Sequence, residues 1–365
     1  MNKDFYMKLT IELAKKGFLY TSPNPMVGAV CVKNGRIIST SYHYKFGEYH
    51  AERRCLMENI DFRGAELYVN LEPCSHEGKT PPCTDIILEK GIKKVYVAHE
   101  DPNPKVKGIE ILREKGVEVE VGILREKAIE LNQAFLCNVG KKRPYVTLKL
   151  ATSLDGKIAL YNGNSKGISS EEVLKYVHLL RAENDAILVG IGTVLMDDPE
   201  LTVRFEGYEK KIKRIILDSK LEFPVKSKLF NTREKGDLLI FTSKNSNKNK
   251  KNLLKDNGIK VIEVENNKEG ELNITEVLST LFKMRVGKLL VEGGAKIAAS
   301  FLRERNVDVF IQEIAVNKIL GGGYSYSDSL RIASVHESKI IKKWKTFNMD
   351  DNVIVEGVIN VYGYN

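Results

Sequence analysis

The chain has 365 residues, of which 42% are hydrophobic, 29% charged and 8% aromatic. This composition is typical of a globular protein, so it excludes gross disorder and the fibrous classes. No stretch approaches the roughly 18 consecutive apolar residues that a membrane-spanning helix needs. Asp4, Lys8 and Glu12 interrupt the apolar positions of the N-terminus, which excludes a typical signal peptide. We therefore expect a cytoplasmic protein with no membrane partner.

Basic residues outnumber acidic ones by 57 to 48, which gives a formal net charge of +9. The one dense run of lysines, between Lys244 and Lys260, contains no aromatic residue and no arginine. Nucleic-acid grooves usually interleave such side chains so that they stack on bases. We interpret the run as a solvated loop followed by a helix, and we expect no nucleic-acid partner.

Helix-like and strand-like patterns alternate through the first 140 residues. Apolar residues recur on one helix face over 4–16, and a hairpin turn at 33–36 follows the strand-like run 27–32. The other predicted elements are a helix after His50, strands at 67–71 and 95–98, and helices at 83–90, 109–115 and 124–137. Alternation of this kind favours an α/β sheet covered on both faces.

A glycine, three cations and a proline at 140–144 separate this half of the chain from a second one. The alternation restarts at Tyr145, with strands expected at 146–150, 186–189, 214–217, 238–241, 261–264 and 288–291. We therefore predict two α/β domains, spanning residues 1–143 and 144–365.

The first half contains an ordered set of metal-ligating residues. His50 is followed by Cys74, which comes directly after a proline, and nine positions later by Cys83. One histidine and two thiolates can bind zinc and leave its fourth position for water. Bound zinc lowers the pKa of that water to about 7, which creates a hydroxide near neutral pH. Glu52 is then placed to shuttle protons between this water and a leaving amine.

This order of residues is the signature of zinc deaminases, H-x-E followed by P-C-x-x-C. The nine-position separation between Cys74 and Cys83 departs from the short spacing of the nucleic-acid-editing forms. A structural zinc site is the alternative, and it would need a fourth ligand. His76 or His43 could supply that ligand.

Two glycine-containing turns in the second half are candidates for binding a dinucleotide. Gly190 and Gly192 follow a predicted strand, but Leu195 stands where the Rossmann fingerprint has its third glycine. Gly293 and Gly294 join the strand at 288–291 to a predicted helix, where backbone N–H groups can approach a pyrophosphate. A tight turn without a ligand is the alternative for both.

Three segments of the first half resemble the deaminase half of the bifunctional bacterial riboflavin-biosynthesis deaminase-reductase: SPNPMVG at 22–28, HYKFGEYHAE at 43–52 and LEPCSHEGKTPPC at 71–83. The resemblance implies a cytidine-deaminase-like αβα fold and, as substrate, a diaminopyrimidinone that carries a ribosylamino 5′-phosphate. It places one zinc ion per chain on His50, Cys74 and Cys83, and the proton shuttle on Glu52. It also implies substrate contacts for Asn24, His43, His76, Lys79 and Asn103.

Four segments of the second half resemble the reductase half of the same enzyme, at 147–160, 179–204, 214–219 and 291–302. They imply a dihydrofolate-reductase-like α/β fold in which NADPH reduces a ribosyl group to ribityl. The positions that resemble cofactor-binding sites are Ala151, Gly167, Thr193, Asp197, Ser219, Gly293 and Gly294. Those that resemble substrate-binding sites are Ser165, Arg181, Leu201, Arg204 and Glu292.

Several of these residues also suit their roles chemically. The guanidinium forks of Arg181 and Arg204 match the oxygens of a phosphate, although Arg181 could instead pair with a helix neighbour. Glu292 could bind the ribose hydroxyls, and Lys149 could polarise the sugar carbonyl or imine of the substrate. Thr242, Ser243 and Lys244 follow a predicted strand and could hold the 2′-phosphate of NADPH.

The chain departs from the family pattern at two places. Gly167 stands where the family has a tryptophan that contacts the cofactor, and the loop after Asn103 is about two residues short, with Gly108 alone where the family has G-x-G. The leading hypothesis is nevertheless a bifunctional enzyme that forms a homo-oligomer. A nucleic-acid editor, or a deaminase with a degenerate reductase half, is the alternative.

Overall fold

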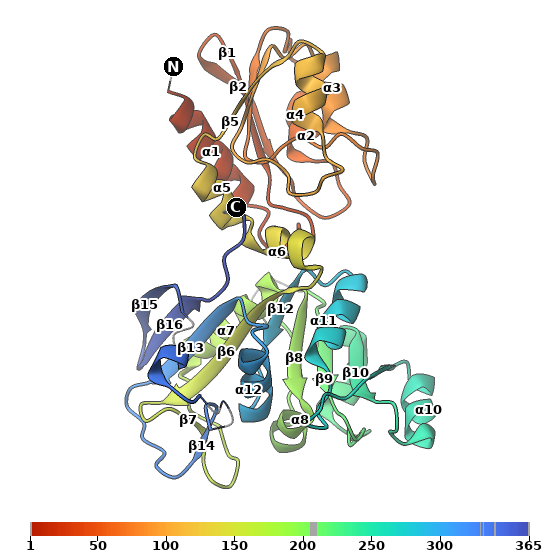
Figure 1. Cartoon of the computed structure of the whole chain (residues 1–365), viewed down its shortest axis with the longest axis vertical. Coiled ribbons are helices and arrows are strands. Elements are labelled where there is room, and N and C mark those ends of the chain that lie inside the picture. The colour runs from red at the N-terminus through yellow and green to blue at the C-terminus, as the bar shows by residue number, and fades with distance from the viewer. Residues whose placement is uncertain (1, 205–209, 329, 331, 339–340, 364–365) are drawn as a thin grey trace. The chain divides into compact units, whose positions relative to one another are not determined.

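The computed structural model describes residues 2–204, 210–328, 330, 332–338 and 341–363. The contacts divide the chain into two units (Figure 1). The first contains residues 1–142 and 362–365, and the second contains 143–361. The expected boundary differs from this division by one residue, and the end of the chain belongs to the first unit instead of the second. The cause is local, because the Gln133 side chain donates to the Tyr362 carbonyl and accepts from its amide, at 2.9 and 2.8 Å.

The first unit contains a five-stranded sheet in the order β2-β1-β3-β4-β5. Its strands are β1 (Gly28–Lys33), β2 (Arg36–Tyr42), β3 (Glu66–Val69), β4 (Lys94–Val97) and β5 (Glu118–Val121). Its helices are α1 (Lys3–Lys15), α2 (Ala51–Leu56), α3 (Cys83–Glu89), α4 (Gly108–Glu114), α5 (Arg125–Leu131) and α6 (Gln133–Lys141). The single helix expected at 124–137 is therefore two helices, which meet at Asn132.

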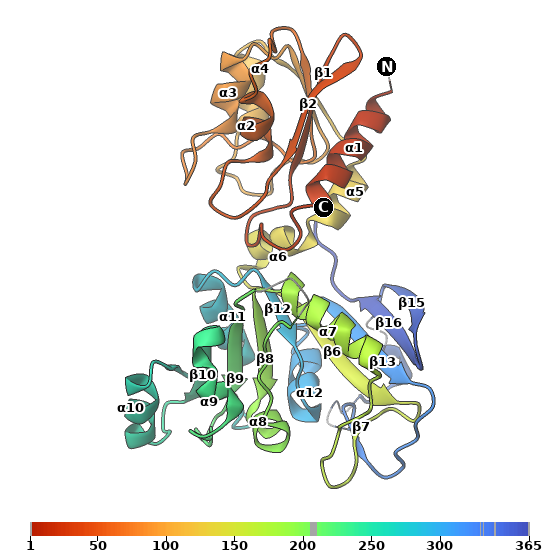
Figure 2. The same cartoon turned by 180° about the vertical axis from the view of Figure 1, so that it is seen from behind.

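Alternating side chains of β1 and β3 feed two separate cores, because successive residues of a strand point to opposite faces. Val30 and Tyr68 pack under α1 and α5, whereas Cys31 and Leu67 pack under α2, α3 and α4. Figures 1 and 2 show these two helical layers on either side of the sheet. The expected αβα architecture is confirmed.

The second unit contains a nine-stranded sheet in the order β11-β10-β9-β8-β12-β6-β13-β16-β15. Its strands are β6 (Tyr145–Ser153), β8 (Ala186–Gly190), β9 (Lys213–Leu217), β10 (Leu238–Ser243), β11 (Lys260–Val264), β12 (Lys288–Val291), β13 (Val309–Ala315), β15 (Lys343–Met349) and β16 (Asn352–Val358). The strands from β11 to β13 are parallel, and β16 and β15 add an antiparallel edge. A separate pair is formed by β7 (Lys157–Ala159) and β14 (Tyr324–Ser325).

Helices cover both faces of this sheet. They are α7 (Glu171–Glu183), α8 (Ile191–Asp197), α9 (Lys228–Asn231), α10 (Lys248–Asp256), α11 (Ile274–Lys283) and α12 (Ala295–Arg303), with short 3₁₀ turns at Arg233–Lys235 and Val335–Ser338. In Figure 1 α11 and α12 lie in front of the sheet, and in Figure 2 α7 lies in front of it. No helix among the described residues is long and apolar enough to cross a bilayer.

The order of the strands reverses between β8 and β12. The chain runs outward from β8 to β11 and then returns to place β12 between β8 and β6. In open α/β sheets, ligands bind beyond the carboxyl ends of the strands at such a point. The turn after β12, which carries Glu292, Gly293 and Gly294, lies at this position.

Candidate active sites

The three expected zinc ligands converge in the first unit. His50 is the N-cap residue of α2, Cys83 is the first residue of α3, and Cys74 lies in the loop that precedes α3. The Nδ1 atom of His50 lies 3.4 Å from the Cys74 sulfur and 3.5 Å from the Cys83 sulfur. Zn–S and Zn–N bonds of the usual lengths in a tetrahedron separate N and S by about 3.6 Å. The donor set therefore fits a zinc ion without rearrangement.

Neither His43 nor His76 joins this cluster. In the described part of the chain, His50, Cys74 and Cys83 form the only group of metal-ligating residues whose ligand atoms lie within 4.8 Å of one another. A closed structural zinc site, for which one of these histidines was the expected fourth ligand, is therefore not supported. The arrangement is that of an open site with three protein ligands.

Glu52 lies on the first turn of α2, two residues after His50, and its side chain is buried. Its Oε2 atom has no hydrogen-bond partner among the described residues. Burial raises the pKa of this carboxyl group to about 7. Glu52 is therefore a buried acid with one oxygen left for a ligand, beside the metal-ligating cluster.

Asn24 and His43 form a second polar pair of the same unit. The Asn24 amide lies 3.2 Å from His43 Nε2, and His43 Nδ1 lies 3.2 Å from the Tyr49 carbonyl. The rings of His43 and His50 meet edge to face at 5.3 Å. His43 is only 2% exposed and is therefore not a surface residue, and burial lowers its pKa to about 4.

The other predicted substrate contacts of this unit are more exposed. His76 and Lys79 lie in the loop between Cys74 and Cys83, and the Lys79 ammonium lies 4.1 Å from the centre of the Phe46 ring. The Asn103 side chain accepts a hydrogen bond from the amide of Lys105 at 3.2 Å, so its oxygen already shapes the loop after β4.

Two residues that shape the zinc site were not among the predicted site residues. The Glu72 carboxylate accepts hydrogen bonds from the amides of Asp101, at 3.1 Å, and Ile109, at 2.9 Å. A Cβ atom on Gly108 would lie 1.9 Å from the Pro73 carbonyl oxygen. Only glycine fits there, so the lone glycine of the shortened loop packs against the residue before Cys74.

In the second unit, the glycines near the strand ends divide into two kinds. A Cβ atom on Gly190 or Gly293 would approach the Ile297 side chain to 2.9 or 2.6 Å, so these two allow α12 to pack closely. A Cβ atom on Gly294 or Gly192 would meet nothing within 4 Å. Gly294 caps α12, and its open surroundings leave the N–H groups of that helix end accessible to an anion.

Arg181 and Glu292 form a bidentate ion pair. Arg181 Nε donates to Glu292 Oε1 at 2.9 Å and Nη2 donates to Oε2 at 2.8 Å, while Nη1 donates to the Thr202 carbonyl at 3.2 Å. The fork that was expected to face a phosphate therefore binds a carboxylate. The partner is also not a helix neighbour, since Glu292 follows β12.

Lys149 lies on β6, where its ammonium pairs with Glu313 of β13 at 3.0 Å. Arg204 is more exposed and lies 3.5 Å from the Glu200 carboxylate, while its amide donates to His178. The Leu201 side chain is buried, so only its backbone can face a ligand.

The residues expected around the 2′-phosphate of the cofactor lie at neighbouring strand ends. The Thr242 hydroxyl donates to the Ser219 carbonyl at 3.3 Å, and the Ser243 hydroxyl donates to the Asn266 side chain at 2.7 Å. Lys244 forms an ion pair with Glu265, which follows β11. An acidic residue that the sequence analysis did not consider therefore holds the proposed phosphate-binding cation.

The remaining predicted cofactor contacts lie on β6, on α8 and in the loop before α7. Ala151 is on β6, Thr193 and Asp197 are on α8, and Gly167 is in the loop, two residues after Ser165, which is a predicted substrate contact. Burial raises the pKa of Asp197, and the Ser165 hydroxyl is close enough to oppose this rise. Gly167 has a φ of +82°, and its carbonyl accepts a hydrogen bond from Lys318.

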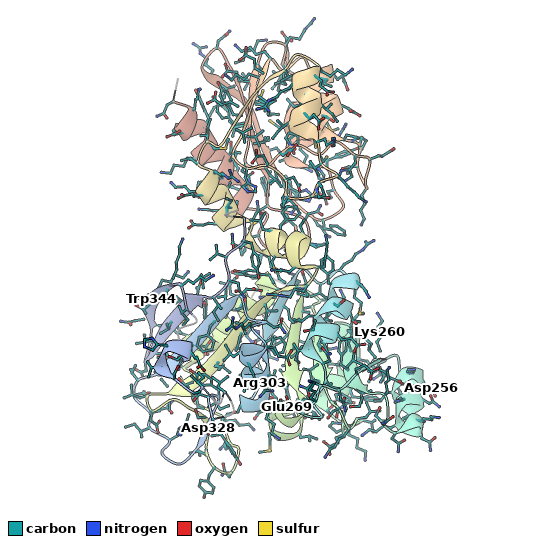
Figure 3. All side chains as sticks on the ribbon, viewed as in Figure 1. Asp256, Lys260, Glu269, Arg303, Asp328 and Trp344 are labelled. Carbon is teal, nitrogen blue, oxygen red and sulfur yellow. The ribbon has the colours of Figure 1, made fainter. Side chains whose placement is uncertain are left out.

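Trp344 does not replace the tryptophan that the family has at the position of Gly167. It lies on the edge strand β15, where Figure 3 labels it, and its side chain is 71% exposed. Position 167 therefore has a left-handed backbone and no side chain on which a ring could stack.

Comparison with known families assigns both halves of the chain. A family model described as the RibD C-terminal domain matches residues 144–350. A second one, described as the cytidine and deoxycytidylate deaminase zinc-binding region, matches residues 1–99. A riboflavin biosynthesis protein RibD from Aquifex aeolicus is 46% identical over 353 residues, which cover 96% of each chain.

The chain belongs to the RibD family of riboflavin biosynthesis. A RibD protein from Bacillus amyloliquefaciens is 45% identical over 82% of this chain and 81% of its own length. The crystal structure of a diaminohydroxyphosphoribosylaminopyrimidine deaminase/5-amino-6-(5-phosphoribosylamino)uracil reductase from Thermotoga maritima superimposes with a TM-score of 0.83 at 38% identity, over 98% of both chains. An Acinetobacter baumannii RibD structure gives a TM-score of 0.86 at 33% identity, with the same coverage.

Membership of the RibD family makes the chain a bifunctional enzyme, a hydrolase through its deaminase domain and an oxidoreductase through its reductase domain. The two domains imply zinc and a nicotinamide cofactor in general terms. The alternative of a nucleic-acid editor is not supported, because the relatives match along nearly the whole chain, reductase half included.

Proposed function

We propose that residues 1–143 deaminate 2,5-diamino-6-(5-phosphoribosylamino)pyrimidin-4(3H)-one, with one zinc ion held by His50, Cys74 and Cys83. The observation that carries this proposal is the convergence of the three ligand atoms at tetrahedral spacing. Zinc, when bound, supplies a Lewis acid that lowers the pKa of water to about 7. Glu52 holds and transfers the proton that must pass from this water to the departing ammonia.

The pair of Asn24 and His43 orients the pyrimidine in this proposal. Burial keeps the His43 imidazole neutral at physiological pH, so the ring can donate one hydrogen bond and accept another. His76 and Lys79 lie in the exposed loop beside Cys74, where a phosphate can reach them from solvent. Asn103 completes the contacts with the substrate. It does so through its backbone, or through its side chain once the hydrogen bond from the Lys105 amide is broken.

We further propose that the second unit reduces the ribosyl group of the deaminated product to ribityl, which gives 5-amino-6-(5-phosphoribitylamino)uracil. NADPH, when bound, supplies the hydride. The Gly294 turn receives its pyrophosphate at the N-terminus of α12, and Ser219, Thr242, Ser243 and Lys244 receive its 2′-phosphate. Ala151, Ser165, Gly167, Thr193 and Asp197 line the rest of the ligand site in this proposal.

Glu292 and Lys149 act on the sugar in this proposal. Arg181 holds the Glu292 carboxylate by both oxygens, so that it can accept hydrogen bonds from ribose hydroxyls in a fixed orientation. Arg204 is the more exposed guanidinium and is the one available for the substrate phosphate. We also propose that the enzyme is a homo-oligomer, which size-exclusion chromatography with light scattering would test.

The experiment that tests the two-site proposal uses Glu52→Gln, which keeps the shape of the side chain and removes its base. Deamination should fall by about 10²–10⁴, bound zinc should stay, and reduction of separately supplied deaminated substrate should continue. Cys74→Ser and Cys83→Ser should lose zinc by metal analysis. Loss of both activities in zinc-replete, folded Glu52→Gln protein would contradict the proposal of two independent sites.

A further inference from the structure

Lys149 lies between two carboxylates that come from the two strands beside its own. The sheet places β6 between β12 and β13. Glu292 follows β12, and Glu313 lies on β13 with its carboxylate 3.0 Å from the Lys149 ammonium. The Lys149 side chain is 11% exposed and that of Glu313 is fully buried. The Lys149 ammonium is therefore held by a carboxylate that is buried within the sheet.

The two carboxylates have different partners. Both oxygens of Glu292 are bound by Arg181. Oε2 of Glu313 receives the Lys149 ammonium and, at 3.2 Å, the Ser169 hydroxyl. Oε1 of Glu313 has no hydrogen-bond partner among the described residues. Because Arg181 already neutralises Glu292, Glu313 is the acid that has Lys149 as its counter-ion.

A buried carboxylate of this kind is costly to the fold. A charge taken out of water must be paired and hydrogen-bonded, and an unpaired buried oxygen loses its hydration without compensation. Burial accordingly raises the pKa of Glu313, and the Lys149 ammonium opposes the rise. An apolar residue at position 313 would avoid this cost. The presence of a glutamate there therefore indicates a role other than stabilising the fold.

We propose that Glu313 is a positioning residue of the reductase reaction, which holds the Lys149 ammonium toward the sugar so that Lys149 delivers the proton of the reduction. This inference rests on the proposed function of the second unit. It assigns Lys149 the role of an acid and gives that acid a partner on the neighbouring strand.

The step balances in protons and electrons. The C1–O bond of the ribosyl ring breaks, and the ring oxygen takes a proton from the Lys149 ammonium. C1 would accept the hydride that bound NADPH supplies, so the sugar carbon would be reduced and the cofactor oxidised. Lys149 then regains a proton from water. Glu313 exchanges no proton in this cycle, and its charge fixes the ammonium in place.

Other groups that face this pair do not replace Glu313. Ser169, before α7, donates a hydrogen bond and carries no charge. Tyr176 of α7 has its pKa raised by burial and by acidic residues that include Glu313. Glu292 also acts on Glu313 through its charge, but it is bound to Arg181. Within the described residues, Glu313 is the carboxylate that forms an ion pair with Lys149.

The test compares Glu313→Gln, Glu313→Asp, Lys149→Met and the double variant Lys149→Met/Glu313→Gln in the full-length enzyme. Glu313→Gln should lower kcat of reduction by about 10- to 100-fold, as expected when a reacting group is displaced, and leave the KM for NADPH nearly unchanged. The loss of reduction on the alkaline side should move to lower pH. Glu313→Asp should restore part of kcat.

The double variant separates positioning from packing. If Glu313 acts through Lys149, adding Glu313→Gln to Lys149→Met should change kcat little. Glu356→Gln, a charge removal on the strand next to β13 at a residue paired with Lys345, should leave reduction unchanged. Deaminase activity and thermal unfolding of each variant check that the chain is folded.

Additive losses in the double variant, together with an unshifted pH profile, would overturn the positioning role. Wild-type reductase rates in Glu313→Gln would overturn it as well. The proposed function fails in a different way, since the wild-type enzyme would then show no NADPH-dependent reduction at all. The two failures are therefore distinguishable in one experiment.

Discussion

Arg181 and Glu292 are 111 residues apart in the chain and form a two-pronged ion pair, with N–O distances of 2.9 and 2.8 Å. The pair joins α7 to the turn after β12, at the reversal point of the sheet. Its carboxylate is the one that the sequence assigns to the sugar. The arginine holds this carboxylate in one orientation, and in the proposed function it acts on the substrate through Glu292.

Breaking this pair from one side should be strongly destabilising. Glu292→Met or Arg181→Met leaves the partner charge buried, which costs about 3–5 kcal/mol in comparable pairs. The double variant Arg181→Met/Glu292→Met should lose much less than the sum of the two single losses. Urea unfolding of the four proteins measures this, and simple additivity would contradict the pairing.

The same pair should make the free energy of unfolding depend on pH in the acidic range. Burial alone would raise the pKa of Glu292, but the Arg181 guanidinium outweighs it and lowers the pKa below its ordinary value of 4.5. Because the folded pKa is the lower one, the stabilisation is fully present above about pH 4.5 and is lost as the pH falls through the folded pKa. The free energy of unfolding should fall less steeply in this range in Arg181→Met/Glu292→Met. Parallel curves for this variant and the wild type would be the contrary result.

Gly108→Ala should damage the zinc site and spare the reductase. The added methyl group would lie 1.9 Å from the Pro73 carbonyl, so the loop that carries Cys74 must move. We expect weaker zinc retention during dialysis against a chelator and lower deaminase activity. Gly140→Ala is the matched control, because a Cβ atom there meets nothing within 4 Å. Equal zinc retention in both variants would show that the loop tolerates the shift.

The Lys244–Glu265 ion pair should tune the choice of cofactor. If Lys244 receives the 2′-phosphate, Lys244→Met should weaken NADPH binding several-fold and leave NADH binding unchanged. Glu265→Gln should have the opposite effect on NADPH, because it removes the carboxylate that competes for the ammonium. Fluorescence titrations at two salt concentrations would measure both effects. Identical NADPH affinities in all three proteins would place the 2′-phosphate elsewhere.

The sequence predicts most of the parallel strands correctly, because a buried parallel strand is a continuous apolar run. The strands β8, β10 and β12 are of this kind. The strands β5, β13, β15 and β16 were not predicted. Of these, β15 has mostly exposed side chains that show no apolar period. The break between α5 and α6 was also missed. It occurs at Asn132, whose side chain pairs with the distant backbone of Met26.

The convergence of His50, Cys74 and Cys83 could be predicted because they belong to two short motifs, one at the start of α2 and one that leads into α3. The ion-pair partners of the predicted reductase residues could not be predicted from the sequence. Glu292, Glu313 and Glu265 reach Arg181, Lys149 and Lys244 from other strands or turns, and no local spacing encodes such pairs. Gly108 illustrates the same point. A glycine is required at this position because the Pro73 carbonyl lies against it, and this contact exists only in the folded unit.

Mass spectrometry of the reaction products shows whether one chain performs both chemistries, deamination first and reduction second. Purified enzyme is incubated with the phosphoribosylamino pyrimidine, with and without NADPH. Without NADPH we expect a product about one mass unit heavier, from replacement of an amine by a carbonyl. With NADPH we expect a further gain of about two units, from hydride and proton addition. A product two units heavier than the substrate that keeps its amine, or no mass change under either condition, would contradict this expectation.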